Sequence, residues 1–127
     1  MNDNSKLVSN NTNRAEQTST TRSYEVSMTL RCEKEFLKQI KKDSNGIEAW
    51  VDSVMKELAS NPTFGAKLSS RELPGYRSVH SKDNNYRIIY KADEFPEPKV
   101  LVIAIGHREN IYGKATREAQ LLRSENQ

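Results

Sequence analysis

Several residue types and patterns are scarce in this sequence, and each absence excludes a class of protein. The 127 residues include a single cysteine, Cys32, so the chain cannot form an internal disulfide, which suits a reducing compartment. No apolar run approaches the roughly 18–20 residues that a membrane-spanning helix requires. The amino terminus, MNDNSKLVSN, lacks the apolar core of a signal peptide. We therefore expect a cytoplasmic protein.

Residues that bind cofactors are equally scarce. The five glycines are scattered, so the sequence has no glycine-rich phosphate loop. Two histidines and one distant cysteine do not form a zinc-ligand set, and no carboxylates have the spacing of a calcium loop. The sequence therefore predicts neither a metal site nor a cofactor.

The residues that are present describe one small, charged domain. Hydrophobic residues make up 35% of the chain and charged residues 29%, which is typical of a modest interior under a polar surface. The length allows a single core. The net charge of +3 is mild, and anion binding depends on whether cations gather on one face. Charge alone therefore does not identify the ligand.

Composition divides the chain into three segments. Residues 1–22 are rich in Asn, Ser and Thr and have few apolar side chains, so we expect a disordered tail. Residues 23–115 carry the periodic patterns of a folded domain. Residues 116–127 are expected to form a C-terminal helix or tail, because the stretch from Ala115 to Leu122 favours a helix.

The first part of the domain predicts a strand followed by two helices. Apolar and polar residues alternate from Ser23 to Leu30, as in a half-buried strand. Two amphipathic helical patterns follow, separated by the breaking residues 43–46, and the second ends at Asn61-Pro62. The apolar stripe of the first helix is Cys32, Phe36, Leu37 and Ile40. Two one-sided helices joined by a turn are expected to pack together on a sheet.

The second part predicts an antiparallel meander of three strands. Strands are expected at about 76–81, 86–91 and 99–107, with a turn at 82–85. The last strand is continuously apolar from Val100 to Ile105, which indicates cover on both faces or a central position. The expected fold is therefore α+β, with the order β-α-α-β-β-β. The aromatic residues expected in its core are Tyr24, Phe36, Trp50, Tyr86 and Tyr90.

That order, with the residues that fill it, resembles the RelE/ParE toxin superfamily over the folded domain. The resemblance begins in the opening segment YEVSMTLRCEKEFLKQIKK. It continues in Asn61-Pro62, Lys67-Leu68, the segment YRIIY at 86–90, and the segment IGHR at 105–108 followed by Tyr112. Each motif is common, but their joint occurrence in this order is specific for the fold. Activity is a separate matter, because one fold carries several functions.

The resemblance implies a toxin of a type II toxin–antitoxin system and leaves two mechanisms open. RNA-cleaving members enter the ribosomal decoding site and cut messenger RNA, which inhibits translation and arrests growth, whereas other members poison DNA gyrase and have no nuclease site. A third alternative is a non-toxic protein-interaction domain of the same fold. The resemblance also implies a cognate antitoxin, with the ribosome and messenger RNA as further partners of a nuclease.

Metal-free RNA cleavage needs a proton acceptor, a proton donor and cations for the growing negative charge. Arg87 and Arg108 match family positions where an arginine sits in the cleavage pocket, and guanidinium binds two phosphate oxygens at once. Tyr112 matches a tyrosine that stacks on a base or assists proton transfer. Without the resemblance, the residues alone favour reading each arginine as a solvated strand residue.

Further candidates come from the same segments. His80 lies where family nucleases carry a basic residue, and imidazole titrates near working pH, so His80 is a candidate proton shuttle. Arg77 lies nearby, but a one-residue bulge would exchange which of Arg77 and His80 faces the pocket. Some relatives carry two lysines on this strand, so the identity of the base stays open. The remaining candidate RNA-binding residues are Lys67 and Lys82 at the rim and His107, which also reads as a turn-shaping residue.

Overall fold

The computed structural model describes residues 23–42 and 46–125. The expected tail over 1–22 and part of the expected turn at 43–46 lie outside the described residues. Within the described part of the chain, no helix is both long enough and apolar enough to cross a membrane.

The elements confirm the predicted α+β class and its order. They are β2 (Glu25–Met28), α1 (Leu30–Lys42), α2 (Ile47–Ser60), β3 (Ala66–Lys67), β4 (Tyr76–His80), β5 (Tyr86–Asp93), β6 (Lys99–His107) and α3 (Ile111–Glu125). Two features differ from the sequence prediction. The short strand β3 was not expected, and α3 is longer than predicted and continues through the expected boundary at 115/116.

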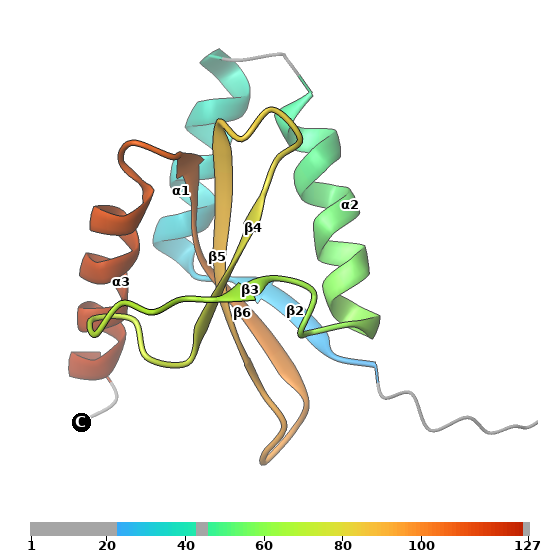
Figure 1. Cartoon of the computed structure of the whole chain (residues 1–127), viewed down its shortest axis with the longest axis vertical. Coiled ribbons are helices and arrows are strands. Elements are labelled where there is room, and N and C mark those ends of the chain that lie inside the picture. Colours follow the sequence, from blue (N-terminus) through green and yellow to red (C-terminus); the bar gives the residue numbers. More distant parts are fainter. Residues whose placement is uncertain (1–22, 43–45, 126–127) are drawn as a thin grey trace, which may run out of the picture.

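The five strands form one sheet in the order β2-β6-β5-β4-β3 (Figure 1). The pairs from β4 to β6 are antiparallel, as predicted, and the unexpected strand β3 is also antiparallel to β4. The edge strand β2, in contrast, runs parallel to β6. Parallel neighbours need a long connection, and here the whole of α1 through β5 separates the two strands. Periodicity within a strand does not encode such a partner, so this pairing was not predictable from the local pattern.

Helices cover both faces of the sheet, with α2 on one side and α3 on the other (Figure 1). On the face of α1 and α2, the cluster includes Phe36, Leu58, Ile88, Tyr90 and Val102. On the face of α3, the cluster includes Ile89, Ile103, Ile111, Ala115 and Ala119. Strand β6 contributes to both clusters, which confirms the prediction from its continuous apolar run.

Two side chains depart from the predicted apolar pattern. Leu30 begins α1 instead of ending the first strand, and it is 75% exposed. Leu37 is 53% exposed. The buried face of α1 centres on Cys32 and Phe36, which are four residues apart, and Leu37, the residue after Phe36, points away from that face. The N-cap of α2 is Gly46, whose φ of 86° lies in the left-handed region, and no side chain caps this helix.

The turn after α2 is anchored to the sheet by Tyr90. The Gly65 amide donates to the Tyr90 hydroxyl at 2.8 Å, and that hydroxyl donates to the Pro62 carbonyl at 2.7 Å. Gly65 is buried here, and a Cβ atom at this position would lie 2.8 Å from the Ser78 carbonyl oxygen. The tight contact explains why a glycine occupies this turn.

Candidate functional site

The hairpin of β4 and β5 places His80 directly opposite Arg87. Directly opposed residues on antiparallel strands share one face of the sheet. Arg87 is two residues before Ile89, which packs in the α3 cluster, so Arg87 and His80 belong to the face that α3 covers. The structure thus brings together two of the four predicted catalytic residues.

The turn that joins the two strands is fixed by its own side chains. The Asp83 carboxylate accepts hydrogen bonds from the Ser81 hydroxyl at 2.7 Å and from the Asn85 amide at 3.0 Å. These bonds lower the pKa of Asp83, because they stabilise its charged form. The Asn84 amide donates to the Ser81 carbonyl at 2.9 Å. The turn therefore presents Asn84 in a defined conformation.

Arg87 is held at this turn through part of its guanidinium. Its Nη1 donates to the Asn84 carbonyl oxygen at 3.1 Å, and its Nη2 donates to Asn84 Oδ1 at 3.1 Å. Its Nε is buried and has no hydrogen-bond partner among the described residues. A guanidinium has five N–H groups; two bond Asn84 and the Nε–H is buried, so two N–H groups on the Nη atoms are left to bind an anion.

The imidazole of His80 is tuned by its neighbours. Desolvation of the ring and the positive charge of Arg87 lower the pKa of His80 from its ordinary 6.5, and a hydrogen bond with the Asn84 side chain partly opposes them. His80 is therefore neutral at pH 7 and able to accept a proton.

The charge of Arg87 acts on His80 in a testable direction. Replacing Arg87 with Gln is expected to raise the pKa of His80 toward 6.5, because the repulsion from a neighbouring cation is removed. NMR titration of the His80 ring protons measures the midpoint, and Arg87→Lys is the control that keeps the charge. The pKa of His80 is lower in the folded protein than in the unfolded chain, so acidification through pH 6.5 lowers the free energy of unfolding. This loss of stability should be smaller in Arg87→Gln. An unchanged His80 midpoint in Arg87→Gln would contradict this coupling.

Arg108 and Tyr112 lie at the same end of the sheet. The Arg108 amide donates to the Asn85 carbonyl at 2.8 Å, and Arg108 is two residues beyond Gly106, the partner of Arg87 across the β5–β6 ladder. Both Arg108 and Tyr112 are exposed, and Tyr112 lies in the first turn of α3, which begins at this end of the sheet (Figure 1). The backbone of Arg108 is thus brought beside the β4–β5 turn, and Tyr112 lies at the same end of the sheet.

Arg77 and Lys67 lie away from that group. Arg77 pairs with Tyr90 on the opposite face from His80, and its Nη1 donates to the Gly65 carbonyl at 2.7 Å. Lys67 on β3 pairs with Arg77. The question that the sequence left open is thereby answered: His80, not Arg77, shares a face with Arg87. Arg77 instead holds the loop after α2.

His107 and Lys82 lie on the side of α1 and α2. His107 pairs with Tyr86, and the two rings meet edge to face with centroids 5.8 Å apart. Its Nδ1 accepts a hydrogen bond from the Glu109 amide at 3.3 Å, so His107 shapes the turn after β6 as an acceptor. Lys82 is exposed in the β4–β5 turn and lines a hollow with Trp50.

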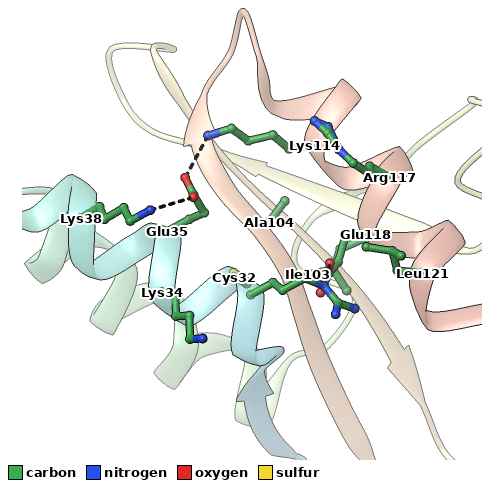
Figure 2. Close-up of a pocket in the computed structure, with 11 residues that line it drawn as sticks. Cys32, Lys34, Glu35, Lys38, Ile103, Ala104, Lys114, Arg117, Glu118 and Leu121 are labelled. Atoms are coloured by element: carbon green, nitrogen blue, oxygen red, sulfur yellow. Dashed lines mark hydrogen bonds and ion pairs between the residues drawn. The ribbon is translucent and has the colours of Figure 1, made fainter. Parts of the chain in front are cut away.

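A groove of about 340 Å³ between α1 and α3 was not anticipated from the sequence (Figure 2). Its floor includes Cys32, Ile103 and Ala104, and none of the predicted site residues lines it. Burial raises the pKa of the Cys32 thiol to about 12, so this cysteine is protonated and is not a nucleophile. The groove joins segments far apart in the chain, and no local motif marks it.

Asn84 is the site residue that sequence reasoning missed. The sequence does contain a hint of its conformation, because asparagine is among the few residues that adopt a left-handed backbone in turns. The φ of Asn84 is 66°. That signal marks a turn, however, and does not reveal that the side chain faces Arg87.

Comparison with known structures supports the fold. The chain matches a double arginine-to-alanine mutant of the E. coli toxin RelE in the free state, with a TM-score of 0.55 and 19% identity, over 76% of this chain and 94% of that one. It matches the isolated E. coli RelE toxin with a TM-score of 0.54 and 21% identity, over 75% and 97%. For the intact E. coli RelBE toxin–antitoxin complex, the TM-score is 0.53 at 17% identity, over 66% and 95%.

Sequence comparison identifies the family. Comparison with curated protein sequences returns no match. Residues 26–112, which span β2 through the start of α3, match the family described as the ParE toxin of the type II toxin–antitoxin system parDE. With that match over most of the chain and the RelE-like fold of its sheet and helices, the chain belongs to the ParE toxin family, within the RelE/ParE superfamily of type II toxins.

Proposed function

We propose that the chain is the toxin of a type II toxin–antitoxin pair and acts as a metal-independent, ribosome-dependent endoribonuclease of messenger RNA. The observation that carries the proposal is the pairing of His80 with Arg87 on one face of the sheet, beside the backbone of Arg108. A neutral imidazole next to a partly unengaged guanidinium is suited to phosphate chemistry.

The proposed reaction is an attack of the RNA 2′-oxygen on the adjacent phosphorus. The 2′-hydroxyl loses its proton as the new P–O bond forms, the P–O bond to the 5′-oxygen breaks, and that oxygen takes up a proton. His80 serves as the proton shuttle, since it is neutral at pH 7. Arg87 and Arg108 stabilise the added negative charge on the phosphate oxygens.

Tyr112 is assigned to stacking on a base of the messenger RNA, because the residue is 39% exposed in the first turn of α3. Tyr112→Phe is expected to keep most of the activity, whereas Tyr112→Ala should lose about 1–3 kcal/mol of stacking, equivalent to about 5- to 150-fold. Single-turnover cleavage of ribosome-bound messenger RNA measures both. If Tyr112→Phe fell as far as Tyr112→Ala, the hydroxyl would be needed and the stacking assignment would be wrong.

The direct test of the function is to add the purified protein to ribosomes translating a defined messenger RNA. Toeprinting or sequencing of the products is expected to show cleavage in the decoding site and not in free RNA. Intact messenger RNA in this assay would reject the nuclease.

A second candidate is a gyrase-poisoning toxin without nuclease chemistry. It is favoured by the family match itself and by the placement of Arg77 and Lys67, which leaves few cations at the proposed site. Inhibition of gyrase supercoiling by the purified protein, with messenger RNA untouched, would establish this candidate instead.

A cognate antitoxin is the proposed protein partner. The similar E. coli toxin RelE is found in complex with its antitoxin and with an antitoxin peptide. Co-expression with the product of the adjacent gene is expected to restore growth that the toxin alone arrests, and co-purification of the two chains tests the contact.

A further inference from the structure

Asn84 has a role in the site that neither the family nor the motifs assign. We propose that Asn84 is a positioning residue, which fixes the guanidinium of Arg87 beside His80 through two acceptor oxygens of one turn residue. The expected effect of Asn84 on the rate rests on the proposed nuclease function. That Asn84 orients the guanidinium of Arg87 does not depend on that function.

Two oxygens of Asn84 meet the same guanidinium. The carbonyl oxygen accepts from Nη1 and Oδ1 accepts from Nη2, each at 3.1 Å. Two bonds fix the plane of the guanidinium, whereas one would leave it free to rotate. Asn84 therefore determines the direction in which the remaining N–H groups of Arg87 point.

This arrangement depends on the left-handed backbone of Asn84, whose φ is 66°. A non-glycine residue in that region needs support from its surroundings. The support comes from the Asn84 amide bonded to the Ser81 carbonyl and from the Asp83 carboxylate, which accepts from both Ser81 and Asn85. The turn is thus held in the conformation that brings both oxygens to Arg87.

Asn84 also influences His80. Its side chain opposes the lowering of the imidazole pKa that desolvation and the charge of Arg87 cause, so one residue acts on both partners of the cross-strand pair. An effective reaction requires the cation and the proton acceptor to be held in fixed relative positions, and small misplacements are costly in rate. Asn84 meets this requirement through its two bonds to Arg87.

Asn84→Gly separates positioning from turn formation. Glycine adopts positive φ more readily than asparagine and keeps the carbonyl oxygen, so a purely conformational role predicts a variant at least as active as the wild type. The positioning role predicts instead that kcat for ribosome-bound messenger RNA falls about 10- to 100-fold, with KM little changed, because one charge-assisted bond is lost. The matched control is Asn85→Ala, in the same turn. This variant also removes a side-chain amide, but that amide bonds Asp83 and not Arg87.

NMR of the Arg87 Nε–H group provides a readout that does not depend on activity. The resonance is expected to be sharp in the wild type, broadened by exchange in Asn84→Gly, and sharp again in Asn84→Asp, which retains Oδ1 as an acceptor. Wild-type kcat together with an unchanged resonance in Asn84→Gly would overturn the inference. If the wild-type protein cleaved no RNA, the proposed function would fail, and the resonance would still decide whether Asn84 orders Arg87.

Discussion

Replacing both Arg87 and Arg108 with alanine is expected to abolish messenger-RNA cleavage and growth arrest while leaving the fold intact. Removing one donor that stabilises a developing negative charge commonly costs about 100- to 1,000-fold in rate, and here two are removed. Neither arginine is part of a hydrophobic cluster, so the loss should come from the transition state. Cleavage on programmed ribosomes and growth after induction measure the effect.

The control for this double variant is Arg71→Ala. Arg71 is exposed in the loop between β3 and β4, outside the proposed site. Its removal lowers the net charge by one, against two in the double variant, and is expected to leave cleavage unchanged. Circular dichroism and thermal unfolding verify that each variant is folded. Cleavage retained in a folded Arg87→Ala/Arg108→Ala variant would discard this site.

The second large effect is expected from Gly65→Ala, this time on stability. The new Cβ atom would lie 2.8 Å from the Ser78 carbonyl oxygen and 2.9 Å from Cε1 of the Tyr90 ring. The turn would have to move away from the hydroxyl that holds it, with a loss of about 2–3 kcal/mol in the free energy of unfolding. Urea denaturation, with the midpoint and the slope fitted separately, measures this loss.

Gly113→Ala is the matched control for that substitution. Gly113 lies within α3, and a Cβ atom there has no heavy atom within 4 Å outside its immediate chain neighbours and the backbone of the helix. Alanine favours a helix over glycine, so this variant should be more stable by about 0.5–1 kcal/mol. Equal stability of Gly65→Ala and the wild type would show that the anchored turn adapts without cost.

The contrast between Arg77 and His80 shows how tertiary structure separates two candidates that the sequence leaves equivalent. They are three residues apart on β4, and a shift of one residue would exchange their faces. The pairing of Arg77 with Tyr90 and of His80 with Arg87 fixes the register. Arg77 then bonds the Gly65 carbonyl, and the proposed site keeps the imidazole.

Local patterns in the sequence were sufficient to predict the class of fold and most of its elements. Helical and alternating periodicity located α1, α2 and the strands β4 to β6, because each pattern reflects local burial of one face. The continuous apolar run of β6 indicated cover on both sides for the same reason. Family motifs supplied Arg87, Arg108 and Tyr112 as candidates.

Which of those candidates lie together depends on long-range contacts between segments. The parallel pairing of β2 with β6, the groove between α1 and α3, and the bonds from Arg87 to Asn84 all depend on contacts that local periodicity does not encode. A periodic pattern reports whether a side chain is buried, whereas a site requires knowledge of which other chain segment that side chain faces. Which segment a side chain faces is set by strand register and by the conformation of a single turn.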